Sequence, residues 1–189
     1  MVIPCHGQQE GDTLINRGAV VAVRNNLLYD ATLSPNLGLE LRLDSTWTLG
    51  MNGGLNLWDI DKEKNKKWRH LLVAPTFRKY LNGAAFQKGY LETDLIYSHF
   101  NVGNTSIPFG LYSSVKDRRL QGDLFALGGK YGYGWILGRD WRLEAEAGIA
   151  IGYAWFKEYD CPLCGAFLGN GDRIFLLPQL GVNVVYIIN

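Results

Sequence analysis

The sequence lacks any apolar stretch long enough to cross a membrane as a helix. Its mean hydropathy is −0.07, and none of its apolar runs approaches the roughly 18 residues that such a helix needs. This excludes a transmembrane helix but not a transmembrane β-barrel, whose strands are apolar on one face only. The formal net charge of +1 is also small, which argues against a nucleic-acid partner.

Cysteine and histidine are scarce, with three of each in the chain. Cys161 and Cys164 are the only close cysteine pair, and they fall in a stretch that we expect to be a loop. In an exported chain, a loop-closing disulfide is the default for such a pair. A zinc site would need two further ligands, and only His6, His70 and His99 exist. A redox pair would normally begin a helix, and the sequence predicts no helix. We therefore expect neither a metal nor another cofactor.

What the chain does contain is strict alternation, clearest over Trp141–Trp155. Odd positions carry large apolar side chains, whereas even positions carry charged or very small ones. A period of two over 15 residues predicts a β-strand. Such a strand would be roughly 45 Å long and would rise about 30–35 Å along a barrel axis at a tilt near 40°. This is enough to cross a bilayer with an aromatic residue at each interface.

The size of the alternating side chains indicates which face looks outward. An eight-stranded barrel has an interior only just filled by side chains, so Gly, Ala and paired charges fit inside while a column of Leu, Ile and Trp does not. An outward belt of such residues is tolerated only in lipid. The alternative is a soluble barrel with an apolar interior and a polar outside.

Eight segments share this alternation, and their connections alternate between long and short. The predicted strands are Gly18–Leu28, Asn36–Asp44, Trp47–Trp58, His70–Leu81, Ala85–His99, Gly122–Leu137, Trp141–Trp155 and Ile174–Ile188. The long loops are Leu28–Pro35, Asp59–Arg69, Asn101–Arg119 and Phe156–Arg173. Short periplasmic turns, long extracellular loops and periplasmic termini are typical of outer-membrane barrels.

We therefore predict one all-β domain over residues 18–189, an eight-stranded antiparallel up-and-down transmembrane β-barrel in the cell outer membrane. Pro75 and Pro178 fall inside predicted strands, where each removes a ladder donor, so a bulge or local break is expected at both. Residues 1–17 are expected to be a signal-peptide remnant followed by a flexible segment, with Gly7 as the last residue before a cleavage site. The alternative for this segment is a disordered tail. Cys5 follows Pro4, which makes it a poor lipoprotein cysteine.

Charged residues on the predicted inner face form a balanced set. Its members are Arg24, Glu40, Arg42, Asp44, Arg78, Lys88, Glu92, Asp94, Lys130, Arg142, Glu144 and Glu146. Charges cut off from water must be paired, so we expect a lumen filled by salt-linked side chains. A narrow ion or small-solute channel is the alternative. Catalysis by Glu144 and Glu146 is less favoured, because no nucleophile is placed beside them.

Outward aromatic residues are expected to form the girdles that contact outer-membrane lipid and lipopolysaccharide. These residues are Trp47, Tyr97, Trp135, Trp141, Tyr153 and Trp155. The basic runs Lys62–Arg69 and Lys116–Arg119 would contact lipopolysaccharide phosphates or simply be solvated loops. Ser98 and His99 are adjacent on one strand and face opposite ways, so they do not suggest the dyad of a lipid-modifying enzyme.

Several motifs together resemble one known family, the domain-of-unknown-function 3575 family. They are Val23–Asp30, Ser34–Glu40, Lys67–Pro75, Pro108–Tyr112, Gln121–Gly122, Tyr131–Leu137, Trp141–Glu144 and Tyr159–Gly165. The resemblance covers about Val20 to the end of the chain. It departs at Thr76, where members often have Glu.

The resemblance implies a predicted outer-membrane barrel of Bacteroidota whose members often lie near fimbrial assembly genes, and it transfers no catalytic residue. We therefore expect no enzyme but a structural or accessory protein of the cell surface. Its loops would contact a fimbrial or other outer-membrane protein partner. A channel and an outer-membrane lipid-modifying enzyme are the alternatives.

Overall fold

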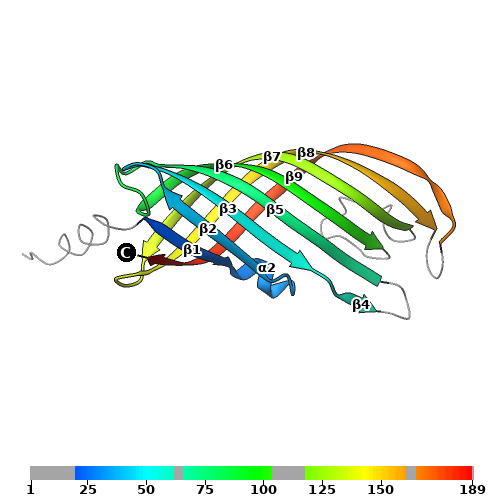
Figure 1. The fold of residues 1–189 in the computed structure, drawn as a ribbon, viewed down its shortest axis with the longest axis horizontal. Coiled ribbons are helices and arrows are strands. Elements are labelled where there is room, and N and C mark those ends of the chain that lie inside the picture. Colours follow the sequence, from blue (N-terminus) through cyan, green and yellow to red (C-terminus); the bar gives the residue numbers. More distant parts are fainter. Residues whose placement is uncertain (1–19, 62–65, 104–117, 161–164, 189) are drawn as a thin grey trace, which may run out of the picture.

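The computed structural model describes residues 20–61, 66–103, 118–160 and 165–188. Nearly all of them lie in strands (Figure 1). The elements are β1 (Val21–Asn26), α2 (Leu27–Ala31), β2 (Asn36–Arg42), β3 (Trp47–Asn56), β4 (Asp59–Asp61), β5 (Lys66–Tyr80), β6 (Lys88–Gly103), β7 (Arg118–Ile136), β8 (Trp141–Asp160) and β9 (Phe167–Ile188). Among the described residues, no helix has the length and apolarity to cross a membrane.

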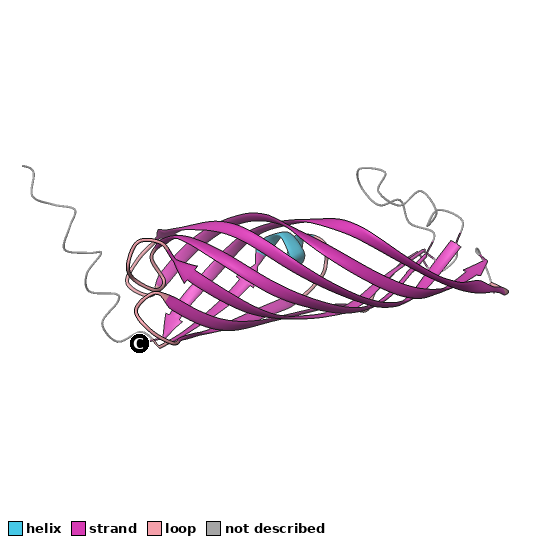
Figure 2. Ribbon diagram, turned by 90° about the horizontal axis from the view of Figure 1, so that it is seen from above, coloured by secondary structure: helices cyan, strands magenta, loops and turns pink. Residues whose placement is uncertain are grey.

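The strands form a closed antiparallel ring. Apart from β4, each strand pairs with the ring strands before and after it, with β3 pairing directly with β5, and β1 pairs with β9 to close the circle. The short β4 only extends the β3–β5 hairpin beyond the ring. The prediction of eight antiparallel strands in sequence order is therefore confirmed. Figure 2 shows how the strands wrap around one interior.

The register sets the tilt of the strands. Starting at Ile187 of β9 and moving from partner to partner round the ring, the path returns to β9 at Leu177. It passes through Ala22, Glu40, Gly50, Thr76, Asp94, Gly128 and Ala150. The return from 187 to 177 is a stagger of ten residues. With eight strands about 4.8 Å apart and a rise of about 3.3 Å per residue, this stagger gives a tilt of about 40°.

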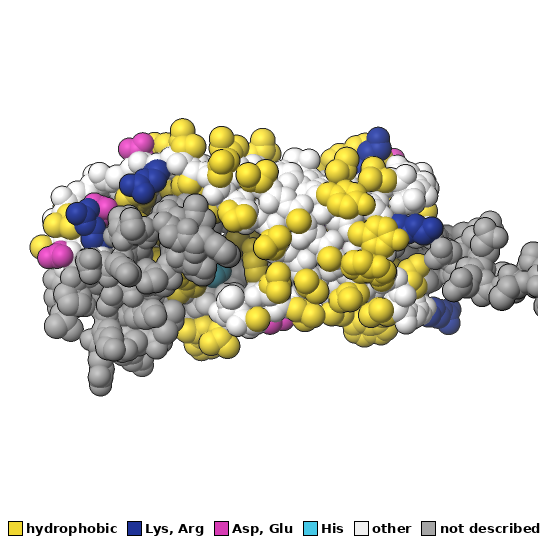
Figure 3. All heavy atoms as spheres, turned by 180° about the vertical axis from the view of Figure 1, so that it is seen from behind, with side chains coloured by type: hydrophobic (Ala, Val, Ile, Leu, Met, Phe, Trp, Pro, Cys, Tyr) yellow, Lys and Arg dark blue, Asp and Glu magenta, His cyan; other side chains and the backbone are white. Residues whose placement is uncertain are grey.

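The two faces of the ring carry the side chains that the alternation predicts. Leu39 and Ile149 are 48% and 55% exposed on the outside, whereas Arg142 and Glu144 are each 1% exposed inside. Hydrophobic side chains are spread over the outer surface in Figure 3, and most of the charged ones visible there lie toward its two ends. The bulky apolar face therefore points outward.

The ends of several strands differ from the prediction. Two predicted loops, Asp59–Arg69 and Phe156–Arg173, are largely strand, because β5 begins at Lys66 and the β8–β9 hairpin continues to Asp160 and Phe167. These strand ends project beyond the apolar band with polar residues on both faces, so they lack the alternation that marks a strand. The predicted strand Ala85–His99 also begins later than expected, because β6 begins only at Lys88. The connection from β5 is therefore longer than the short turn that the alternation of loops predicts.

The two prolines are accommodated without a bulge. Pairing of β5 with β6 skips from Val73–Tyr97 to Thr76–Asp94 with its register unchanged, which is a local break beside Pro75. Pro178 pairs with Ile149 of β8. On its other side, β1 pairs with β9 only from Asn183 to Ile188. Pro178 thus lies where β9 has lost one neighbour.

Candidate functional site

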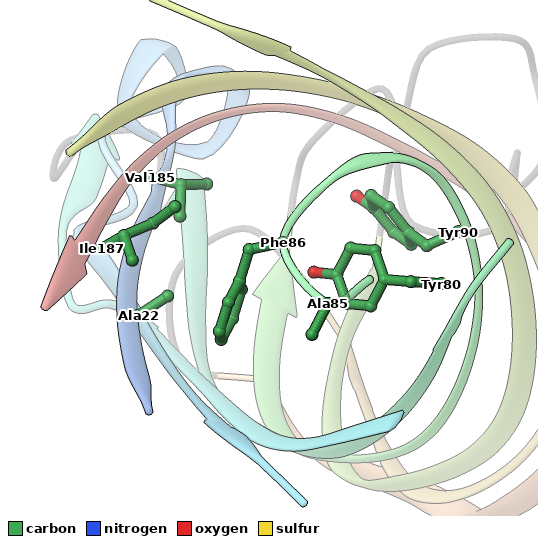
Figure 4. Close-up of a cluster of buried hydrophobic side chains, with 7 residues drawn as sticks. All are labelled: Ala22, Tyr80, Ala85, Phe86, Tyr90, Val185 and Ile187. Atoms are coloured by element: carbon green, nitrogen blue, oxygen red, sulfur yellow. The ribbon is translucent and has the colours of Figure 1, made fainter. Parts of the chain in front are cut away.

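The interior is closed at one end by an apolar plug. This end, the turn end, carries the β2–β3, β5–β6 and β7–β8 turns together with Val20 and Ile188. Here the segment Leu81–Gln87 folds into the ring, where Phe86 packs between the strands (Figure 4). The plug consists of Ala22, Tyr80, Ala85, Phe86, Tyr90, Val185 and Ile187. Phe86 adopts a φ of 63°, a left-handed conformation that turns the segment inward.

A layer of paired charges lies next to the plug, with Arg78 at its centre. The Arg78 guanidinium is 3.2 Å from Glu40 Oε2 and 3.0 Å from Glu144 Oε2, and its Nε also contacts Glu92. Its Nη2 is 3.2 Å from Glu146 Oε2. One cation is thus shared by four carboxylates, which come from three strands.

Tyrosine and threonine hydroxyls add hydrogen bonds to the carboxylates of this layer. Tyr80 and Thr48 donate to Glu40 Oε1 at 2.8 and 2.6 Å. Tyr90 donates to Glu144 and Glu146, both at 2.9 Å. These buried carboxylates are therefore hydrogen-bonded as well as paired, which is the condition for burying a charge at tolerable cost.

Three further cations complete the network. Lys130 Nζ lies 2.7 Å from Glu92, 3.2 Å from Glu146 and 3.4 Å from Asp94. Arg24 Nη1 is 3.3 Å from Glu92 Oε2, and its Nε donates to Asn52 at 3.0 Å. Arg142 Nε is 3.0 Å from Glu144 Oε1.

Glycines on neighbouring strands make room for these large inward side chains. A Cβ on Gly132 would collide with the Tyr90 ring, and one on Gly134 would collide with the Arg142 guanidinium. A Cβ on Gly38 would lie 2.6 Å from Arg24 Cγ. The high glycine content of the inner face therefore has a packing reason: a long side chain from one strand lies flat over the next strand.

The other half of the interior is a cavity of about 600 Å³. Arg24, Asp94, Lys130, Glu146 and Gln179 form its floor, which is the upper side of the charge layer. Apolar side chains form its walls, among them Leu72, Ala74, Ile96, Leu124, Phe175 and Leu177. The expectation of a lumen filled by side chains is right for the turn half only. It is wrong for the other half, because most inward residues there are short or apolar and leave a cavity between them.

The structure brings most of the predicted lumen charges together and separates three of them. Arg24, Glu40, Arg78, Glu92, Asp94, Lys130, Arg142, Glu144 and Glu146 form the network just described. Asp44 is exposed in the β2–β3 turn and accepts backbone hydrogen bonds there. Lys88 is exposed at the start of β6, where a φ of 50° turns it out of the alternation. Arg42 ends β2 half-exposed near the rim.

The predicted girdle residues fall into two groups on the outer surface. Near the turn end, Trp47 stacks on Phe77 at 4.7 Å, Trp135 meets Tyr133 at 5.1 Å and Trp141 meets Tyr186 at 4.9 Å. Farther along, Tyr97 and Trp155 flank Phe125 at 4.9 and 5.7 Å, and Tyr153 lies 6.1 Å from Trp155. From Trp141 to Tyr153 along β8, the rise is about 30 Å at the strand tilt.

No enzymatic constellation emerges from the described residues. Ser98 is buried inside while His99 lies outside, as their adjacency predicts. His99 Nδ1 instead lies 2.9 Å from Asp123 Oδ1, which also accepts from Tyr97 at 2.8 Å. Across the described ranges, no group of three or more His, Cys, Asp and Glu side chains could hold a metal ion. Cys161, Cys164, Lys116 and residues 1–17 lie outside the described residues.

Sequence reasoning missed the polar partners of the charges. The missed residues all lie at inward positions of their strands, namely Tyr80, Tyr90, Thr48 and Asn52. Their odd or even position within the alternation, which we call parity, is the signal that could have placed them inside. Parity also places Gln179 inside, but it does not predict that Gln179 donates to Asp94 Oδ2 at 2.7 Å. Pairing across the ring depends on register and stagger, which no single strand encodes.

Comparison with known proteins gives one match. The family model described as "Protein of unknown function (DUF3575)" matches residues 6–188. No curated protein and no solved structure matches the chain. The match covers nearly the whole chain and assigns no activity to it.

Proposed function

We propose that this chain, which belongs to the DUF3575 family, is a transmembrane β-barrel of the outer membrane that is sealed and serves a structural or accessory role. The observation that carries this proposal is the combination of an apolar outer surface with a salt-linked interior. Large apolar side chains stand exposed around the ring, while Arg78 and its carboxylates are buried. A protein in water gains nothing from this arrangement, whereas lipid requires it.

The spacing of the aromatic groups supports the same proposal. Clusters around Trp141 and around Tyr153 lie about 30 Å apart along the axis, close to the thickness of a hydrocarbon core. Tyr153 and Tyr97 direct their hydroxyls to Asp172 and Asp123 at 3.0 and 2.8 Å. Amphipathic rings with a polar tip are what a membrane interface favours.

A membrane experiment tests this proposal directly. The full chain, expressed with an export signal, should remain in the outer-membrane pellet after carbonate extraction. It should also migrate faster on a denaturing gel when unheated than when boiled, as folded barrels do. Recovery in the soluble fraction with a single gel mobility would contradict the proposal.

The plug and the charge layer argue against the channel alternative. An ion would have to pass the apolar plug around Phe86 and then the shared carboxylates of Arg78. Planar bilayers containing the purified chain should therefore show no stepwise conductance above the lipid background. Discrete steps would favour a channel over a sealed barrel.

An accessory role would use the strands that project beyond the apolar band. β7, β8 and β9 are the longest strands, and the β8–β9 hairpin reaches furthest from the turn end (Figure 1). Phe167 and Leu168 are exposed on this hairpin. A photo-crosslinker at Leu168 should capture a surface partner, such as a fimbrial subunit, in intact cells. The same crosslinker at Leu127, within the apolar band, serves as the matched control.

A further inference from the structure

The floor of the cavity holds two buried acceptors that lack a donor. Asp94 Oδ1 and Gln179 Oε1 are both inaccessible to solvent, and neither has a hydrogen-bond partner among the described residues. They lie together over Gly128, since a Cβ there would collide with Asp94 Oδ1 and lie 2.8 Å from Gln179 Oε1. An unsatisfied buried acceptor is costly. Both side chains line the cavity, so rotating either one would present its unpartnered oxygen to a donor held there.

Asp94 is the carboxylate of the network that both lines the cavity and carries an unpartnered oxygen. Its other oxygen, Oδ2, accepts from Gln179 Nε2 at 2.7 Å and lies 3.4 Å from Lys130 Nζ, the longest of the three ion pairs of Lys130. A donor at this point would complete the hydrogen bonding of Asp94.

Above this floor the cavity is suited to a hydrocarbon body. Its walls are formed by side chains such as Leu72, Ile96, Leu124 and Leu177, and its volume of about 600 Å³ lies within the range of small-molecule sites. A pocket with apolar walls and a few convergent polar groups at one end selects a molecule of the same polarity pattern.

The cavity also opens sideways through the wall of the ring. β1 and β2 have six and seven residues, so they rise only about 15 and about 18 Å, whereas the 22 residues of β9 rise about 55 Å. Beyond the end of β1, helix α2 takes the place of β1 beside β9. Apolar residues of α2 such as Leu28 are exposed there. The cavity lining includes Leu37 and Leu180, which stand on the outer face of the ring beside α2. We call this opening between α2 and β9 the window.

We propose that this cavity binds an amphiphile with one apolar chain and a terminal hydrogen-bond donor, an ammonium or a hydroxyl, which lies against Asp94 and Gln179. The molecule enters through the window from the membrane, and this entry route rests on the membrane location proposed above. The binding site itself rests only on the cavity and its floor.

Equilibrium binding of four twelve-carbon probes tests the site. Dodecylamine, dodecan-1-ol, dodecane and dodecanoate are titrated into the refolded full chain held in amphipol, which requires no bilayer. Dodecylamine and dodecan-1-ol should saturate at one molecule per chain, and dodecanoate should bind at least tenfold more weakly, because its carboxylate would face Asp94. Asp94→Asn should weaken dodecylamine at least tenfold.

Cavity filling provides the matched control. Ala154→Phe places a ring inside the cavity and should abolish saturable binding, whereas Ala147→Phe on the outer face of the same strand should leave binding unchanged. Heat-modifiable gel mobility shows which variants fold. If Ala154→Phe does not fold, the binding of dodecylamine to Asp94→Asn still decides the test. Equal binding of all four probes, insensitive to Asp94→Asn, would mean hydrophobic partition only and would overturn the site. The absence of saturable binding would overturn it as well.

The window is tested by the rate of uptake from lipid nanodiscs. Leu180→Trp narrows the window and should slow loading of dodecylamine at least fivefold with unchanged final occupancy. Leu176→Trp, on the same face of β9 but not lining the cavity, should not slow it. Equal rates in the two variants would remove the window as the route. Failure of the chain to insert into nanodiscs, with binding in amphipol intact, would count against the membrane location alone.

Discussion

At the scale of single residues, inward glycines decide how the interior packs. Tyr90 is fully buried, and its ring occupies the space that a Cβ on Gly132 would need. The ring cannot easily move away, because its hydroxyl is tied to Glu144 and Glu146. Gly129, on the outer face of the same strand, has nothing within 4 Å of an added Cβ. Small inward residues are thus as much part of the charge network as the charges.

Gly132→Ala should therefore destabilise the fold by about 1–3 kcal/mol through overpacking. Gly129→Ala, three residues away, should change stability by less than about 0.5 kcal/mol, as surface substitutions usually do. The measurement is the free energy of unfolding in urea for chains refolded into lipid vesicles. Equal effects of the two substitutions would show that the Tyr90 ring does not lie over Gly132 in the folded chain.

Arg78 is the residue on which the charge layer depends most. Removing its guanidinium by Arg78→Met leaves Glu40, Glu144 and Glu146 buried without their shared cation. Breaking a buried ion pair on one side costs about 3–5 kcal/mol, and we expect a loss of at least that size in the same unfolding assay. Arg139→Met, in the exposed β7–β8 turn, should be nearly neutral and serves as the control.

Asp44 predicts a pH dependence at the turn end. The backbone N–H groups of Thr46 and Trp47 donate to its carboxylate at 2.6 and 2.9 Å and lower the pKa of Asp44 below its ordinary value. The folded state therefore favours the ionised form. The resulting stability is present above about pH 4, the pKa of an unfolded Asp, and is lost as the pH falls through the lowered pKa.

Asp44→Asn should keep the turn, because the amide oxygen still accepts, but should flatten this acidic dependence. Asp44→Ala should remove both the turn bonds and the dependence. The readout is the urea midpoint of unfolding measured from about pH 6 down to about pH 3, which brackets the unfolded pKa. A wild-type midpoint that falls no faster than that of Asp44→Asn would contradict the assigned role.

Parity predicts which side chains point into the interior, and the exceptions to this rule are confined to particular places in the chain. Arg78, Glu92 and Glu144 alternate with bulky apolar residues, which predicts an inward position, and they lie inside. Asp44 and Lys88 share that parity but sit where the strand ends or the backbone has a positive φ. Parity holds only within a regular strand, so it fails first at strand ends.

At the scale of elements, hydrophobic periodicity locates every ring strand but not its full length. Inside the apolar band the two faces of β8 differ sharply, so Trp141–Trp155 is recognisable. Beyond the band both faces meet polar surroundings, and Phe156–Asp160 carries no such contrast. The five residues of α2 are too few for a helical period, although Asn26 caps the helix by accepting from Leu28 N at 2.9 Å.

The segment Leu81–Gln87 is the element that closes the turn end. Phe86 is 1% exposed and packs against the plug, although its positive φ is unfavourable for a bulky residue. Phe86→Ala should destabilise the fold by about 3–5 kcal/mol, the usual cost of truncating a buried phenylalanine. Leu81→Ala, at the exposed start of the same segment, should cost much less. Urea unfolding of both variants in vesicles measures the difference, and equal losses would show that the plug contributes little.

At the scale of the whole molecule, the closed ring is an inside-out protein with two unequal halves. The stagger of ten residues gives a tilt that brings charges from distant strands to one level, where they pair. The short β1 and β2 leave the other half hollow and open beside α2. The apolar plug closes the turn end, whereas the other half of the ring opens beside α2.

Substitutions on the outer face test most directly whether the ring is surrounded by lipid or by water. Met51 and Leu137 are both exposed, at 48% and 63%, but Met51 lies midway along the apolar band and Leu137 lies at the turn end. Arginine on the lipid face of a barrel costs about 2–4 kcal/mol at the midplane and about 0–1 kcal/mol near an interface. Met51→Arg should therefore destabilise the vesicle-inserted chain by about 2–4 kcal/mol, and Leu137→Arg should be nearly silent. In water both substitutions would be tolerated equally, because both side chains would be solvated. Equal unfolding free energies of the two variants would thus show that the apolar band does not face lipid.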